Sequence, residues 1–280
     1  MKALLFVTQD GGPTDRRMPG THLLQLPLYD QPAFQYSVAN LVSWGIREIL
    51  VLGAPAGLRV LLGDGADYGL NIAYKPLPKR FNLFALLQNH SKWIANQAVC
   101  LMSAHNCLWG ENLSIAYPAE GATILAKRVS GFESYSWLEI DSKPWRVPDL
   151  GFYQPSVLER TRTMSSAGSL SLDLELLNRS YAAQERLQVL RLGGEVAWCD
   201  LHDWDTLWQA SHQAAAWEKA AECKAACLEE IALHLGLIDA EQAVKLYHQY
   251  PPGSYRNYLA RMLVATGIWP EEQRGLRLVE

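Results

Sequence analysis

The sequence lacks an excess of positive charge. Its 280 residues include 25 Lys and Arg against 29 Asp and Glu, a formal net charge of −4. Proteins that bind nucleic acid neutralise phosphates with clustered Lys and Arg, and here these residues are scattered along the chain. No stretch approaches the ~18 consecutive apolar residues of a membrane-spanning helix. We therefore expect neither nucleic acid nor a membrane as a partner.

Cysteine is also scarce and irregularly spaced. The five cysteines form an odd set, with no Cys-x-x-Cys pair and no neighbouring His-x-x-x-His, which excludes the usual signatures of a disulfide framework or a zinc site. Reduced, mostly buried thiols are typical of cytosolic proteins, so we expect a cytoplasmic location. The apolar run within Met1 to Val7 is too short for a signal sequence and is interpreted as a buried strand.

Hydrophobic residues make up 49% of the chain, enough for a large core near the upper size limit of one domain. Short apolar runs alternate with helical patterns, which indicates a mostly parallel sheet with helices on its faces. The expected strands are Leu4 to Val7, Glu48 to Leu52, Asn71 to Ala73, Ala98 to Met102, Leu150 to Tyr153, Gln188 to Leu192 and Val196 to Asp200. The expected helices are near Gln35 to Trp44, Leu58 to Leu62, Leu83 to Ala95 and Leu172 to Gln184, the last after a loop over Thr161 to Ser171.

From Trp204 onward nearly every segment has a helical pattern. The expected helices are Trp208 to His234, Asp239 to Tyr247 and one that starts near Ser254. The fold class is therefore predicted as α/β, with a Rossmann-like, mostly parallel sheet in residues 1–203 and a helical C-terminal element in residues 204–280. Ligands of such sheets bind beyond the carboxyl ends of the strands, so a functional site is expected in the segments after Val7 and Met102.

Several motifs are spread along the whole chain. They are Leu26-Pro27-Leu28-Tyr29-Asp30-Gln31-Pro32, Gly45 to Leu50, Leu61-Leu62-Gly63-Asp64-Gly65, Tyr135 to Asp141, Leu172 to Tyr181, Ala197 to Asp200 and Cys227 to Ala232. Together they resemble the sugar-1-phosphate nucleotidylyltransferases, and in particular the glucose-1-phosphate thymidylyltransferases. The resemblance implies the nucleotide-diphospho-sugar transferase type of fold, a nucleotide or sugar phosphate as ligand, and a homo-oligomer.

The residues that carry this family's chemistry are largely replaced. Nucleotidyl transfer needs backbone amides and cations around the phosphates, and carboxylates that hold Mg²⁺. In this sequence Pro13 aligns with the arginine of the family's Gly-rich loop, and Leu23 aligns with its lysine. His105 aligns with the first metal carboxylate, and a neutral imidazole prefers softer metals than Mg²⁺.

Other positions keep residues of suitable chemistry. Asp200 retains the second metal carboxylate and is predicted as a metal ligand together with His105. In the remodelled loop, Arg16 and Arg17 are the candidate catalytic cations, with solvated side chains as the alternative. The candidate ligand-binding residues are Gly11, Gly12, Asn106, Lys143 and Asp173. Lys143 lies in a segment about a dozen residues shorter than its family counterpart.

Two interpretations of the function stay open, and a third would need a nucleophile and a general base that the sequence does not identify. The favoured one is a catalytically impaired relative, because the replacements gather in one cleft. Such a relative either partners an active paralogue or binds a nucleotide or sugar ligand as a regulator or scaffold. The alternative is an active glucose-1-phosphate thymidylyltransferase with a rearranged phosphate loop, which converts dTTP and a sugar 1-phosphate into dTDP-sugar and pyrophosphate. Mg²⁺ is the expected cofactor only in that case. The third is new chemistry at Cys107 beside His105, for which a buried structural cysteine is the simpler explanation.

Overall fold

The computed structural model describes residues 1–8, 20–110, 115, 120–128, 137–140 and 143–269. Its strands are β1 (Lys2–Phe6), β2 (Pro27–Leu28), β3 (Gln31–Pro32), β4 (Glu48–Leu52), β5 (Asn71–Lys75), β6 (Val99–Ser103), β7 (Asn106–Gly110), β8 (Ala122–Lys127), β9 (Trp137–Ile140), β10 (Lys143–Arg146), β11 (Leu150–Tyr153), β12 (Leu187–Leu192) and β13 (Val196–Asp200). Its helices are α1 (Ala33–Ser43), α2 (Ala56–Leu62), α3 (Leu83–Asn89), α4 (Ser91–Ile94), α5 (Val157–Arg160), α6 (Leu170–Ala182), α7 (Trp204–Ala221), α8 (Leu228–His234), α9 (Ala240–Gln249) and α10 (Ser254–Ala265). Short 3-10 turns are η1 (Leu23–Gln25), η2 (Ala66–Tyr68) and η3 (Thr161–Thr163).

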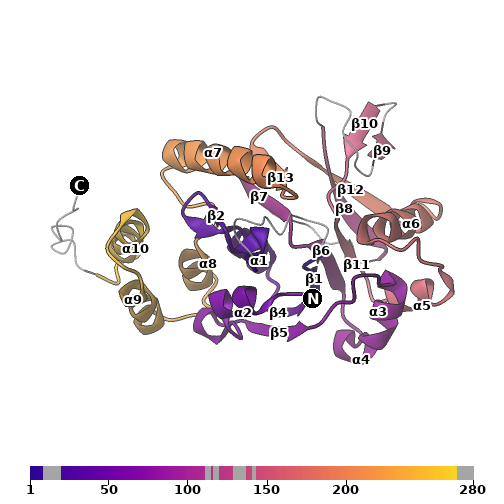
Figure 1. Ribbon diagram of the computed structural model, residues 1–280, viewed down its shortest axis with the longest axis horizontal. Coiled ribbons are helices and arrows are strands. Elements are labelled where there is room, and N and C mark those ends of the chain that lie inside the picture. The colour runs from indigo at the N-terminus through magenta and orange to yellow at the C-terminus, as the bar shows by residue number, and fades with distance from the viewer. Residues whose placement is uncertain (9–19, 111–114, 116–119, 129–136, 141–142, 270–280) are drawn as a thin grey trace.

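The described strands build one large mixed sheet in the order β5-β4-β1-β6-β11-β8-β10-β9, with β12 paired to β8. Strands β5, β4, β1 and β6 run parallel to one another, and β11 lies antiparallel between β6 and β8. Helices α3 to α6 lie at one end of the molecule, and α9 and α10 lie at the other (Figure 1). The predicted α/β class, with a parallel core and C-terminal helices, is confirmed.

Strand β1 is buried on both faces of the sheet. Leu5 belongs to a hydrophobic cluster with the residues of α1, whereas Leu4 and Phe6 belong to a second cluster with residues of α3 and α6. Successive side chains of a strand point to opposite faces, so a strand covered by helices on both sides must be apolar throughout. This explains why an unbroken apolar run marks β1 in the sequence.

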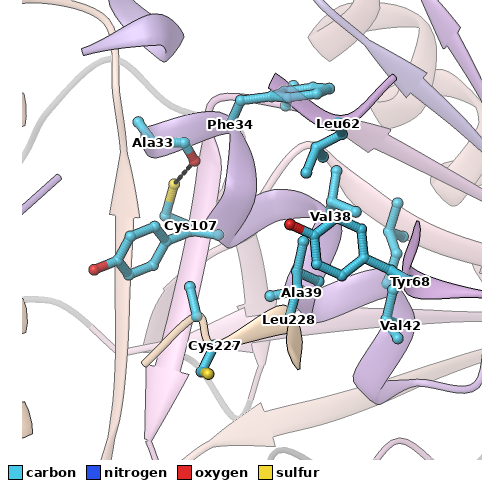
Figure 2. Close-up of a cluster of buried hydrophobic side chains, with 14 of the residues drawn as sticks. Ala33, Phe34, Val38, Ala39, Val42, Leu62, Tyr68, Cys107, Cys227 and Leu228 are labelled. Carbon is cyan, nitrogen blue, oxygen red and sulfur yellow. Dashed lines mark hydrogen bonds between the residues drawn. The ribbon is translucent and has the colours of Figure 1, made fainter. Parts of the chain in front are cut away.

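The first cluster joins segments that are far apart in the sequence. Figure 2 shows Phe34 and Val38 of α1 near Leu62 of α2, Tyr68 of η2 and Leu228 of α8. The C-terminal helices therefore pack on the same core as the N-terminal half. The division at residue 203 stays a prediction, and the hydrophobic core is continuous across it.

Strand β13 does not return to the large sheet as the sequence predicts. It pairs antiparallel with β7, which was not expected, in a separate two-stranded sheet. Helix α1 supports this small sheet, because the buried Asn40 amide donates to the Leu108 carbonyl (2.8 Å) and accepts from the Leu108 N–H (3.1 Å). The Asn40 side chain, on the buried face of α1, thus fixes the position of β7 and of the turn between β6 and β7.

The single helix predicted over Trp208 to His234 is wrong. Helix α7 ends at Ala221, where Glu222 takes a left-handed conformation (φ 54°) that stops a helix. The following turn is fixed by Lys224, which forms ion pairs with Asp30 and Glu218. Asp30 is 194 residues from Lys224 in the sequence, so the helical pattern alone did not reveal the break. The predicted helix over Leu83 to Ala95 is likewise divided, into α3 and α4.

In the described part of the chain, no helix combines the length and apolar character needed to span a membrane.

Candidate functional site

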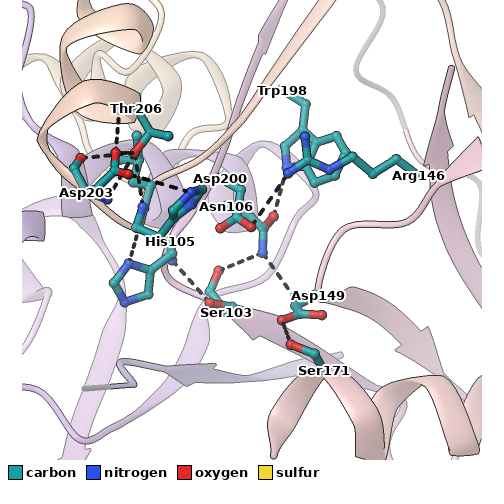
Figure 3. A network of polar contacts seen from close by, with 12 residues as sticks. Ser103, His105, Asn106, Arg146, Asp149, Ser171, Trp198, Asp200, Asp203 and Thr206 are labelled. Carbon is teal, nitrogen blue, oxygen red and sulfur yellow. Dashed lines mark hydrogen bonds and ion pairs between the residues drawn. The ribbon is translucent and has the colours of Figure 1, made fainter. Parts of the chain in front are cut away.

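The two segments selected from the sequence meet at one edge of the large sheet. Strands β1 and β6 are parallel neighbours, with Phe6 opposite Ser103, and the Ala104 N–H donates to the Phe6 carbonyl (2.8 Å). The carboxyl ends of both strands therefore open on the same side. A polar network follows, drawn from the β6–β7 turn, β13, the β10–β11 segment and α6 (Figure 3).

His105 lies buried in the turn between β6 and β7. Its Nδ1 is 2.6 Å from the Leu201 carbonyl oxygen and its Nε2 is 3.3 Å from the Thr8 carbonyl oxygen. Because a carbonyl only accepts hydrogen bonds, Nδ1 carries a proton that it donates to Leu201. The imidazole thus links the end of β1, the β6–β7 turn and the segment after β13.

His22 approaches His105 from the segment before η1, with ring centroids 5.7 Å apart. Its Nδ1 accepts from the Leu24 N–H (3.2 Å) and caps the 3-10 turn. Burial, followed by the charge of His105, lowers the pKa of His22 to about 4, against a smaller opposing effect of the Thr8 carbonyl. His22 is therefore neutral at pH 7 and supplies no cation.

Asn106 lies within the polar network and contacts three of the segments that form it. Its amide oxygen accepts from the Trp198 indole N–H (2.8 Å), and its amide nitrogen lies 3.5 Å from the carbonyl oxygens of Ser103 and Asp149. The latter contacts are long for hydrogen bonds and correspondingly weak. Asn106 is placed in the predicted site, and its contacts join β6, β13 and the start of β11.

Asp200 ends β13 and lies directly opposite Asn106 in the small sheet. One guanidinium nitrogen of Arg146 is 3.9 Å from an Asp200 carboxylate oxygen, and the same guanidinium stacks over the Trp198 ring at 4.5 Å. Burial raises the pKa of Asp200, while His202 and Arg146 partly oppose that rise. The structure thus brings Asp200 and His105 to the same edge, as the sequence predicts.

Asp149 is a site residue that sequence reasoning missed. It directly precedes β11, which pairs antiparallel with β6, so its backbone carbonyl accepts from the Ser103 N–H (2.8 Å). Its carboxylate accepts from the Ser171 hydroxyl, and in Figure 3 it is turned toward that side chain. Burial raises the pKa of Asp149 to about 6; the Ser171 hydrogen bond opposes the rise, and the charge of Asp200 adds to it. The sequence shows only an acidic residue just before an expected strand. The pairing of that strand, β11, with β6 is what places Asp149 in the site.

The other predicted residues lie apart from this network or outside the described residues. Asp173 is fully buried, and its carboxylate accepts from the N–H groups of Leu83 (3.1 Å) and Ala167 (2.6 Å) and from the Ser166 hydroxyl (2.7 Å). These contacts give Asp173 a structural role at the start of α3. Lys143 begins β10 opposite Ile140, and its side chain is not among those described. Outside the described residues lie Gly11, Gly12, Arg16 and Arg17.

The donor set of the site does not fit Mg²⁺. This ion needs an octahedral shell of oxygen ligands, whereas His105 offers ring nitrogens that both face carbonyl oxygens. Among the residues that the structure describes, no three His, Cys, Asp or Glu side chains are grouped so that they could hold a metal ion. The metal assignment of His105 and Asp200 stays a prediction.

Comparison with known proteins gives a consistent set of relatives. The chain is 30% identical over 289 aligned positions to a glucose-1-phosphate thymidylyltransferase from Neisseria meningitidis, covering 94% of this chain and 99% of the relative. It is 30% identical over 263 positions to one from Mycobacterium tuberculosis, covering 85% and 90%. No family model matches the chain.

Solved structures share the fold. A protein from Bacillus anthracis assigned as a glucose-1-phosphate thymidylyltransferase, crystallised with sucrose, superimposes with a TM-score of 0.61 at 18% identity, over 76% of this chain and 95% of that one. An apo UDP-glucose pyrophosphorylase gives a TM-score of 0.50 at 11% identity, over 79% and 99%. At these identities the similarity supports the architecture alone.

Proposed function

The chain belongs to the glucose-1-phosphate thymidylyltransferase family, and we propose that it binds a nucleotide or a sugar phosphate at the ends of β1 and β6. In this proposal its nucleotidyl transfer is impaired. In this role it acts as a regulator or scaffold, alone or beside an active paralogue, in the metabolism of nucleotide sugars.

The observation that carries the proposal is the position of His105. The resemblance places a metal carboxylate there, and the imidazole found instead is fixed by the Leu201 and Thr8 carbonyls. A carboxylate that would coordinate a divalent metal is thus replaced by an imidazole. The imidazole carries no negative charge and instead links two backbone segments. A triphosphate bound here lacks one of the groups that align it for in-line attack.

A second observation concerns the position of the family lysine. Leu23 begins η1, is only 5% exposed and belongs to the hydrophobic core. A lysine at this position would bury an ammonium group among apolar side chains, which is strongly unfavourable. The apolar packing around Leu23 therefore leaves no suitable place for a charged lysine side chain at this position. Losing one such electrostatic contact typically costs ~2.7–4 kcal/mol of transition-state stabilisation.

The alternative is an active glucose-1-phosphate thymidylyltransferase with a rearranged phosphate site. Asp200 favours it, because the carboxylate is retained at the site edge beside Asn106. The length of the similarity favours it too, since the relative from Neisseria meningitidis is matched over 99% of its own length.

A pyrophosphate-release assay separates the two. Purified protein is incubated with Mg²⁺, each common nucleoside triphosphate and several sugar 1-phosphates, and ligand binding is followed in parallel by thermal shift. The proposal predicts a ligand-dependent rise in Tm without enzyme-like pyrophosphate release. His105→Asp alone should not create activity, because the loop cation and the lysine are still missing. Enzyme-like release that Asp200→Ala abolishes would establish the active alternative instead.

A further inference from the structure

Two cysteines lie directly opposite each other in the small sheet beside the site. In the antiparallel pairing of β7 with β13, Cys107 is the partner of Cys199, and the next pair along the ladder is Asn106 with Asp200. Directly opposite residues of such strands point to the same face, and their Cα atoms are ~4.5–5.5 Å apart. A disulfide bond joins residues whose Cα atoms are ~4.4–6.8 Å apart, so the backbone places this pair within reach of one.

Both thiols are free, and each donates to a different acceptor. The Cys107 Sγ donates to the Ala33 carbonyl at the start of α1 (3.7 Å; Figure 2), and the Cys199 Sγ donates to the side-chain oxygen of Gln213 on α7 (3.6 Å). A thiol is a weak donor, so turning the two sulfurs toward each other sacrifices little. All five cysteines lie in the described part of the chain, and no other two of them are strand partners.

The two sulfurs differ in their access to solvent. Cys107 is fully buried, whereas Cys199 is only partly buried. Burial raises the pKa of Cys199 to about 11 and that of Cys107 well above its usual value, so both thiols are protonated at pH 7. Because the thiolate is the reactive form, oxidation is slow and begins at Cys199. The oxidant must be small enough to reach a partly buried sulfur, a condition that hydrogen peroxide meets.

We propose that Cys107 and Cys199 form a reversible disulfide that locks β7 to β13 when the protein is exposed to hydrogen peroxide. The Cys199 sulfur attacks one peroxide oxygen and the O–O bond breaks, which gives a sulfenic acid and one water. The Cys107 sulfur then attacks the Cys199 sulfur. The S–O bond breaks, and its hydroxyl leaves with the Cys107 thiol proton as a second water. Each sulfur has then lost one electron, and both peroxide oxygens are reduced to water.

The bond acts on the site through the neighbouring pair of the ladder. Opposite Cβ atoms are ~4.5–5.5 Å apart, whereas a disulfide needs ~3.5–4.5 Å, so the two strands must move slightly closer. Strained disulfides are the more easily reduced ones, which suits a reversible switch. Asn106 and Asp200 then belong to strands that no longer separate, so oxidation stiffens this part of the site. The inference goes beyond the proposed function and does not depend on which ligand binds.

Peptide mass spectrometry of peroxide-treated protein tests the inference. The purified protein is incubated with excess hydrogen peroxide, the peroxide is removed with catalase, and the remaining thiols are alkylated. The expected result is a linked Cys107–Cys199 peptide, with a fall in titratable thiols from five to three that dithiothreitol reverses. In the linked form, the amide hydrogens of β7 and β13 should exchange at least tenfold more slowly, because the strands open less often.

Two variants keep the test decisive. Cys199→Ser removes the more accessible partner at a partly buried position, so it should fold normally and form no intramolecular link under the same treatment. Cys223→Ser changes another partly buried cysteine and, as the matched control, should form the Cys107–Cys199 link as the wild type does. The inference is overturned if the wild type keeps all five thiols, or if Cys199 accumulates as sulfinic acid without a link. A disulfide that joins Cys199 to a second copy of the chain also overturns it.

Discussion

At the scale of single residues, burial changes the proton affinity of the Asp149 carboxyl. The pKa of its carboxyl is raised from 3.8 to about 6, by burial first and then by the nearby charge of Asp200, although the Ser171 hydroxyl donates to it. The folded chain therefore binds this proton more tightly than the unfolded chain does. By linkage, the free energy of unfolding falls as pH rises from about 4 to 6.

Replacing Asp149 with asparagine should remove that penalty. We expect Asp149→Asn to be more stable than the wild type by roughly 1–3 kcal/mol at pH 7, where the native carboxyl is ionised, and to lose this advantage near pH 4. Urea unfolding at pH 4, 5, 6 and 7 measures the difference, with the exposed Glu159→Gln as the matched control. A stability difference that is the same at every pH would show that the buried charge is not its cause.

At the scale of elements, the site depends on how α7 begins. The helix follows Asp200 by only a few residues, and Asp203 is its N-cap: the carboxylate accepts from the Thr206 N–H (2.7 Å), and the Thr206 hydroxyl is 3.1 Å from the Asp203 N–H. These reciprocal bonds satisfy N–H groups that have no partner within the helix. They also fix the direction in which the chain leaves the site.

Asp203→Ala should destabilise the protein by about 1 kcal/mol, within the ~0.5–2 kcal/mol range of lost N-caps. The Thr206 N–H lowers the pKa of Asp203, so the cap stabilises the fold fully above the unfolded pKa and loses its effect as pH falls through the folded pKa. The difference between wild type and variant should therefore shrink in strong acid. Thermal unfolding at pH 7 and pH 3 measures it, and Asp205→Ala, in the same first turn, should have a much smaller effect.

On the scale of the whole molecule, the outer face of α7 exposes aromatic side chains. Trp208 is 61% exposed, and its ring lies against that of His212 at a tilt of 38° (ring centroids 4.2 Å apart). Trp204 lies one turn before it. By contrast, Cys227, which begins the Cys227 to Ala232 motif, and Leu259 of α10 are buried within the chain's own core. A large exposed apolar surface marks an interaction site, so α7 is the better candidate for a contact between copies.

A homo-oligomer remains our prediction, with α7 at its interface. Light scattering should give a mass that is a multiple of 31.4 kDa at micromolar concentration, and Trp208→Glu should shift the protein toward the monomer by placing a charge in an apolar contact. Val60→Glu, at another highly exposed apolar position, is the matched control and should leave the mass unchanged. A wild-type mass of 31.4 kDa would contradict the prediction.

The sequence by itself determined the parallel core of the fold. Strand β4 matches its predicted bounds, and β1, β5 and β6 differ from theirs by one or two residues. Strands buried on both faces must be apolar throughout, which leaves a signal that needs no knowledge of partners. The same pattern predicts a site at the carboxyl ends of β1 and β6, whereas His105 and Asp200 are predicted from the resemblance to the family.

Only the tertiary structure decided which side chains share that site and which groups they contact. Asp149 and Ser171 are 22 residues apart and come together because β11 pairs with β6 and α6 packs beside it. The break after α7 depends on Lys224 reaching Asp30, 194 residues away in the sequence, and β13 pairs with β7 rather than with the large sheet. Helical and strand patterns report local periodicity, whereas hydrogen bonds and ion pairs between distant residues arise only when the chain is packed, so the sequence pattern carried no signal for them.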